Sequence, residues 1–122
     1  MRSRSIILRK TGGFYQAFDN DAYIINYLFS YKVTNYKCGF PLSALTKVIN
    51  TLEDKKINYI IKGDKEEIKD FKRLNNYNKY LDKSITKRDI DKRIENIIIK
   101  IKELDKDNLE CILKTIEDKL YE

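Results

Sequence analysis

The chain of 122 residues carries 25 Lys and Arg against 19 Asp and Glu, a formal net charge of +6, and contains no His. This length fits one domain and suffices to bury a core without disulfides or a structural metal. Without His, hydrolases of the Ser–His or Cys–His kind are excluded, and so is the commonest zinc ligand.

The remaining composition indicates a cytoplasmic protein. No apolar run approaches the roughly 18 residues that a membrane span needs. The two cysteines, Cys38 and Cys111, are far apart in the sequence and are expected to be free thiols in a reducing compartment. Nothing in the spacing of acidic residues demands a metal or a cofactor, so we expect neither.

Charge is distributed unevenly along the chain. Residues 1–62 hold 10 Lys and Arg and 4 Asp and Glu, whereas residues 63–122 hold 15 of each. A basic surface supplies sequence-independent affinity for nucleic acid. The alternative interpretation is that the excess of positive charge merely reflects a Lys-rich composition.

The first 30 residues predict a strand followed by a helix. Ile6-Ile7-Leu8 begin a buried strand, and Gly12-Gly13 permit a bend or bulge in its course. Asp19 or Asn20 can cap the helix that an apolar stripe predicts over residues 20–30.

Residues 31–62 continue the alternation of strands and helices. Residues 31–38 alternate apolar and polar side chains and predict a strand, and Gly39-Phe40-Pro41 predict a turn. The stripe of residues 45–52 predicts a helix, and residues 57–61 a strand. The order β-α-β-α-β predicts an α/β fold, with a mixed sheet flanked by helices.

The second half predicts mainly helix. Residues 68–73 fit an edge strand or an extended link, and residues 75–81 a short helix. Thr86-Lys87-Arg88-Asp89 have the pattern of a capping box before a helical stripe of aliphatic residues. Asp107 can cap a second helix, so that a helical hairpin or a bent helix ends the chain.

We therefore expect residues 1–84 to form the α/β domain and residues 85–122 a helical hairpin packed on it in the same globular unit. The apolar stripe of the hairpin has two interpretations. It covers the sheet, or it binds a protein partner or a second copy of the chain.

One motif points to a function. Gly12-Gly13-Phe14-Tyr15-Gln16 are followed by Phe18 and by Asp21-Ala22. This stretch resembles the mismatch-recognition motif, GDFYE-x-F-x-x-DA, in the N-terminal domain of MutS-type DNA mismatch repair proteins. Cys38-Gly39-Phe40-Pro41 is similar to the GIP or GVP turn of that domain, and the following helix and strand are also in the family's order.

The resemblance covers roughly residues 5–62 and implies a mixed α/β domain that contacts DNA. It implies that Phe14 is the wedge beside a mispaired base, and that Gln16 occupies the position of the base-contacting acid. With the turn and the basic residues before it, the DNA-binding set becomes Phe14, Gln16, Gly12, Gly13, Arg9 and Lys10.

Two hypotheses for function follow from these residues. In the first, the chain is a small non-enzymatic module that binds mismatched or distorted double-stranded DNA. No Gly-x-x-x-x-Gly-Lys-Ser/Thr string is present, so hydrolysis of a nucleotide by a P-loop is not expected. In the second, the chain is a protein-interaction module, an adaptor or a mobile-element inhibitor, that keeps the fold without binding DNA.

The exposure of the aromatic residues separates these hypotheses. In a strand, Phe14 and Tyr15 point to opposite faces. We expect Phe14 to face solvent and Phe18 to lie in the core. Tyr23, Tyr27, Tyr31 and Tyr36 form either a stacking platform or ordinary packing in the sheet and helix.

Overall fold

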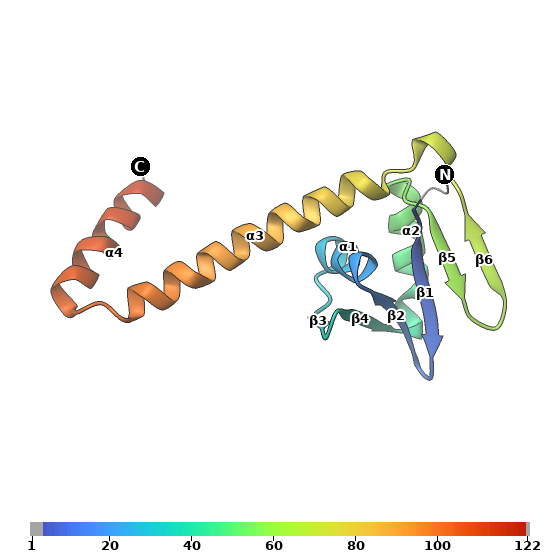
Figure 1. The fold of residues 1–122 in the computed structure, drawn as a ribbon, viewed down its shortest axis with the longest axis horizontal. Coiled ribbons are helices and arrows are strands. Elements are labelled where there is room, and N and C mark those ends of the chain that lie inside the picture. The colour runs from blue at the N-terminus through green and yellow to red at the C-terminus, as the bar shows by residue number, and fades with distance from the viewer. Residues whose placement is uncertain (1–3, 122) are drawn as a thin grey trace. The chain divides into compact units, whose positions relative to one another are not determined.

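The computed structural model describes residues 4–121 and has an α/β fold with C-terminal helices, which confirms the predicted fold class (Figure 1). The chain divides into two compact units, Met1–Lys87 and Arg88–Glu122, called unit 1 and unit 2 below. This division falls close to the boundary expected after residue 84. Packing of the helical pair on the first domain stays a prediction.

Within residues 4–121 the strands form one six-stranded sheet in the order β3-β4-β2-β1-β5-β6. The strands are β1 (Ile6–Thr11), β2 (Phe14–Phe18), β3 (Val33–Thr34), β4 (Lys37–Pro41), β5 (Tyr59–Lys62) and β6 (Glu66–Lys69). The α-helices are α1 (Asn20–Phe29), α2 (Leu45–Asp54), α3 (Tyr77–Lys102) and α4 (Lys106–Leu120). Strands β1 and β5 are parallel and the other neighbours are antiparallel, so the sheet is mixed.

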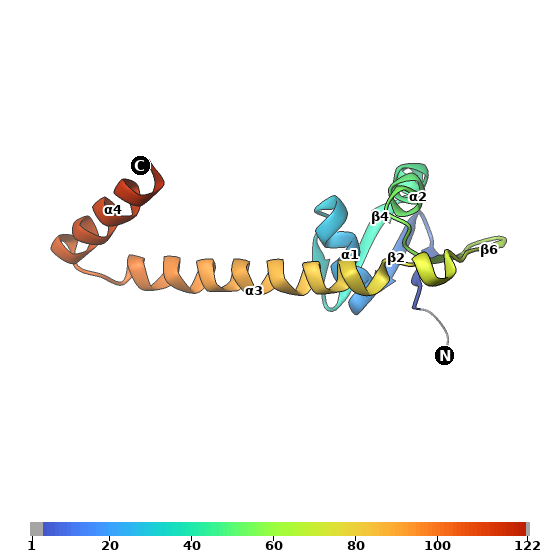
Figure 2. The same ribbon diagram turned by 90° about the horizontal axis from the view of Figure 1, so that it is seen from above.

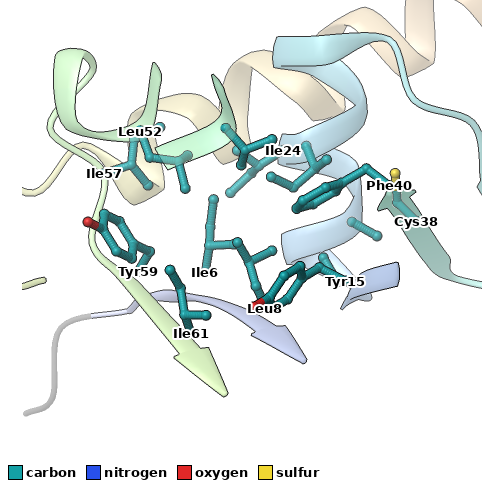
Figure 3. Packing of buried hydrophobic residues seen from close by; sticks show 14 of the residues in the cluster. Ile6, Leu8, Tyr15, Ile24, Cys38, Phe40, Leu52, Ile57, Tyr59 and Ile61 are labelled. Atoms are coloured by element: carbon teal, nitrogen blue, oxygen red, sulfur yellow. The ribbon is translucent and has the colours of Figure 1, made fainter. Parts of the chain in front are cut away.

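Helices α1 and α2 cover one face of this sheet (Figure 2). Every second side chain of the central strands points into the space beneath them, as the period of two requires. These side chains meet the apolar stripes of the two helices (Figure 3). The core comprises Ile6, Leu8, Tyr15, Ala17, Ala22, Ile24, Ile25, Cys38, Phe40, Val48, Leu52, Ile57, Tyr59, Ile61, Tyr77 and Leu81.

Residues 31–41 differ from the prediction. The expected strand is interrupted by a two-residue turn between β3 and β4, formed by Asn35 and Tyr36. Their φ angles of 52° and 62° are typical of a type I′ turn, whose twist matches that of a hairpin. Residues 39–41, predicted as a turn, continue β4, because they pair with β2.

The second half differs as well. The capping box predicted at residues 86–89 is wrong, because these residues lie inside α3, which is continuous from Tyr77 to Lys102. This stretch contains neither Gly nor Pro, so nothing in it interrupts a helix. The cap of α4 is Asp105 rather than Asp107, and its side chain accepts a hydrogen bond from the Asn108 backbone N–H at 2.9 Å.

A network of amides holds the beginning of α3 to the sheet. The buried Asn58 donates its backbone N–H to Asn75 Oδ1 at 2.9 Å, and its side chain donates to Asp70 Oδ1 at 3.0 Å. Asn58 Oδ1 accepts from the Phe71 N–H at 2.6 Å, and Asn75 Nδ2 donates to the Arg4 carbonyl at 2.8 Å. Asn58 and Asn75 each form hydrogen bonds to more than one segment of the chain, so the network fixes where α3 begins.

The carboxylate of Asp21 joins three elements. It accepts a hydrogen bond from the Ile7 backbone N–H of β1 at 3.0 Å and another from the Tyr77 hydroxyl of α3 at 2.5 Å. Asp21 itself lies in the first turn of α1. Burial raises the pKa of this carboxyl above its ordinary value of 3.8, although both hydrogen bonds oppose that shift. Asp21, the acid of the Asp21-Ala22 pair in the motif, is therefore a structural residue that joins β1, α1 and α3.

We expect Asp21→Ala to lower the free energy of unfolding by roughly 1–3 kcal/mol, because the N–H of Ile7 loses its partner. Asp21→Asn should be milder, since an amide can accept from Ile7 while donating to the Tyr77 oxygen. Urea denaturation measures both changes.

The pH dependence of stability is a further test of Asp21. A carboxyl whose pKa is raised in the folded state contributes most to stability below its unfolded-state pKa, and this contribution is lost as the pH rises through the folded-state pKa. Stability of the wild type relative to Asp21→Asn should therefore fall from about pH 3.5 to neutral pH, and a constant difference would contradict this.

Candidate nucleic-acid interface

The strand side chains that point away from the core form the second face of the sheet, called the outer face below. It comprises Ile7, Arg9 and Thr11 of β1, Phe14, Gln16 and Phe18 of β2, Lys37, Gly39 and Pro41 of β4, Ile60 and Lys62 of β5, and Glu66 and Ile68 of β6. None of these residues is buried, whereas the alternate residues of β1, β2, β4 and β5, apart from Lys10, form the core. The outer face is therefore accessible to a ligand.

A two-residue turn places Phe14 at the end of this face. The sequence suggested a bend in a single strand, but Gly12 and Gly13 instead connect the antiparallel strands β1 and β2. Gly12 has a φ of 60°, a conformation that type II′ hairpin turns require at this position and that glycine adopts freely. The carbonyl of Gly13 accepts a hydrogen bond from the Leu42 N–H at 3.2 Å, which ties the turn to the end of β4.

Phe14 and Gln16 lie next to each other on the outer face. Phe14 is 54% exposed, as the sequence predicts, and pairs with Thr11 on one side and Pro41 on the other. Gln16 is half-buried and lies between Arg9 and Gly39. The two side chains are about 7 Å apart along the strand, since each residue advances about 3.3 Å.

Gly39 leaves the side chain of Gln16 accessible. A Cβ at this position would contact Gln16 Cγ at 3.7 Å. The glycine is therefore compatible with a ligand that reaches Gln16.

The outer face carries more basic than acidic side chains. Arg9, Lys37 and Lys62 are exposed on it, and Glu66 is the acidic residue. Among residues 4–121, none of the three basic side chains forms an ion pair. Arg9 and Lys62 lie opposite each other on β1 and β5, in the same row as Gln16. Positive charge thus flanks the Phe14–Gln16 pair.

Lys10 does not belong to this face, although the sequence grouped it with Arg9. Strand alternation turns it to the other side of β1, where its Nζ lies 3.2 Å from the carboxylate of Asp64. Of the six residues in the expected DNA-binding set, the structure gathers Phe14, Gln16 and Arg9 on one face and places Gly12 and Gly13 in the adjacent turn.

Sequence reasoning missed three residues of the outer face. Phe18 was expected in the core, and this is wrong, because it is 40% exposed and lies two residues beyond Gln16 on the same side of β2. Strict alternation from Tyr15 could have revealed it. Lys37 and Lys62 join the face only through strand pairing, for which the sequence held no local signal.

A stack of rings supports β2 from the inside. Tyr15 stacks on Phe40 with ring centroids 6.0 Å apart, Phe40 on Tyr31 at 5.7 Å, and Tyr31 on Phe29 at 5.9 Å. Offset stacking of this kind stabilises the core beyond simple burial. Tyr31 therefore packs inside, as the second interpretation of the tyrosines expected, and the strand that presents Phe14 is held firmly.

The environment of Cys38 disfavours chemistry at its thiol. Cys38 is buried, and burial raises the pKa of its thiol to about 11, which disfavours the reactive thiolate. Within residues 4–121, no group of three or more Cys, Asp or Glu is placed to hold a metal ion.

Comparisons with known proteins do not identify a family. No model of a known protein family matches the chain, and no curated protein matches it. Among the described helices, including the long α3, none has the length and apolar content needed to cross a membrane.

The turn that presents Phe14 should respond differently to alanine at its two positions. Gly12→Ala places a Cβ on a residue with positive φ and should lower the free energy of unfolding by roughly 1–2 kcal/mol. Gly13→Ala has open space around the added Cβ and no positive φ, so it should be neutral or slightly stabilising. Urea denaturation of the two variants measures the difference, and equal losses would contradict the turn geometry.

Proposed function

We propose that unit 1 is a non-enzymatic DNA-binding module whose outer face contacts mismatched or distorted duplex through Phe14 and Gln16. One observation carries the proposal: an exposed Phe14 lies beside an accessible Gln16 on an open, basic sheet face. The resemblance of residues 12–22 to the mismatch-recognition motif of MutS-type proteins supplies the two roles. It also implies a place in DNA repair, and the composition favours the cytoplasm.

Phe14 would act by stacking. A base that stacks on an aromatic side chain contributes on the order of 1–3 kcal/mol. Inserting an apolar wedge between base pairs costs a few kcal/mol, and this cost is smallest where the pair is already mismatched. The difference favours distorted sites over regular duplex.

Gln16 would contact the edge of the displaced base. An amide can both donate and accept hydrogen bonds, so it tolerates several bases. Arg9, Lys37 and Lys62 would hold the phosphates on either side. Unit 1 as a whole has 17 Lys and Arg against 9 Asp and Glu, which favours attraction to DNA.

Fluorescence anisotropy with matched and single-mismatch duplexes, across a salt titration, tests this proposal. We expect tighter binding to the mismatched duplex. Phe14→Ala should weaken that binding by about 1–3 kcal/mol and remove the preference, because the stacked ring is lost.

Arg9→Gln and Lys10→Gln form a matched pair of variants for the same measurement. Each removes one positive charge, and the two residues are adjacent in β1 but point to opposite faces of the sheet. Arg9→Gln should weaken binding to both duplexes and reduce the salt slope by about one. Lys10→Gln should change the slope less. Absence of binding at low salt, or equal effects of the two variants, would refute the proposal.

A carboxylate at position 16 should increase the discrimination between mismatched and matched duplexes. We expect Gln16→Glu to raise the ratio of mismatched to matched affinity, because the acid repels the phosphates of regular duplex while still accepting a hydrogen bond from an exposed base. The same anisotropy assay measures the ratio. Thr11→Glu is the control, since it adds the same charge on the outer face beside Phe14 and should weaken both duplexes alike.

A second candidate function is a protein-interaction module, an adaptor or a mobile-element inhibitor. Its support lies in unit 2, where aliphatic side chains on both helices are exposed. A chain that fails to bind DNA at low salt, while retaining its fold, would favour this alternative.

A further inference from the structure

Unit 2 leaves its apolar side chains exposed. None of residues 88–121 is buried, and only Ile101, Leu104 and Leu109 are half-buried. The exposed aliphatic side chains, between 36% and 71% accessible, are Ile90, Ile94, Ile97, Ile98, Ile99, Ile112, Leu113, Ile116 and Leu120. Units below about 40 residues usually need oligomerisation, disulfides or metals for a stable core.

The spacing on α3 is that of a helix that packs against another helix. Ile90, Ile94, Ile97 and Ile101 of α3, and Leu104 just after its end, follow one another at intervals of four, three, four and three residues. This is the heptad pattern, which gives a continuous apolar seam in a pair of helices. Ordinary surface helices do not need such a seam.

Within unit 2, α3 and α4 diverge from the residues that connect them (Figures 1 and 2). The groove between them has a volume of about 560 Å³. Its aliphatic lining consists of Ile97 and Ile101 of α3, Leu104 of the connecting residues, and Ile112 and Ile116 of α4. The seam and the groove share three residues, so one occupant would cover both.

The charges of unit 2 favour a second copy as that occupant. Unit 2 carries 8 Lys and Arg against 10 Asp and Glu, which disfavours nucleic acid and an anionic membrane surface as partners. Within α3, Arg93 and Lys100 lie along one edge of the seam, and Asp91 and Ile98 lie along the other. A parallel copy would bring the basic edge of one helix against an edge of its partner that carries no positive charge, so like charges do not meet.

We propose that unit 2 is a dimerisation module in which the seam and groove of one chain receive the same helices of a second chain. With 35 residues, it offers about what one side of a standard interface holds, roughly 20–30 residues. The proposal does not depend on DNA binding by unit 1.

Sedimentation equilibrium of the full chain, without DNA, tests this inference. We expect a mass of twice 14.6 kDa at micromolar concentration. Ile97→Glu places a charge in the centre of the seam and should weaken the dimer by roughly 30-fold or more, as when a central interface side chain is lost.

Ile99→Glu is the matched control. Ile97 and Ile99 are 53% and 50% exposed on the same helix, but Ile99 lies off the seam and does not line the groove. It should leave the dimer intact, and circular dichroism should show the same helix content in both variants. A wild-type monomer at several hundred micromolar, or equal effects of the two substitutions, would overturn the proposal.

Discussion

The hydrogen bonding of β2 along both of its edges is the constraint on which the rest of unit 1 depends. Strands β1 and β4 hold it in one register, so Tyr15 and Ala17 face the helices while Phe14 and Gln16 face outward. A slip of one residue would exchange the two sets, exposing core rings and burying the polar amide. The turn at Gly12 and the ring stack beneath Tyr15 both maintain this register.

Polar side chains then decide where the long helix α3 starts. Asp21 joins β1, α1 and α3 through the Ile7 N–H and the Tyr77 hydroxyl, and Asn58 ties the end of the sheet to Asn75. Each of these groups is satisfied by partners far away in the sequence. Such buried contacts are costly to break, so they set the position of α3 more firmly than its own helical propensity does.

The two units differ in how much of their apolar surface they bury. Unit 1 has enough strands and helices to enclose a core of aliphatic and aromatic side chains, and it carries the positive charge of the chain on its surface. Unit 2 has two helices and an exposed seam, with nearly balanced charge. Under our two proposals taken together, a dimer formed by unit 2 carries two outer faces, which can engage one duplex with increased avidity.

Local sequence patterns were enough to predict the α/β class and the positions of α1 and α2, because apolar periodicity is a local property. The exposure of Phe14 was expected from the resemblance of its motif to that of MutS-type proteins. Local patterns could not predict strand pairing, which brings Lys37 and Lys62 to the outer face. Strict alternation along a strand turns Lys10 away from that face and exposes Phe18, so local reasoning could have placed both residues. Helix α3 continues through the predicted capping box, because its first turns are held by contacts from distant segments and no local residue stops the helix.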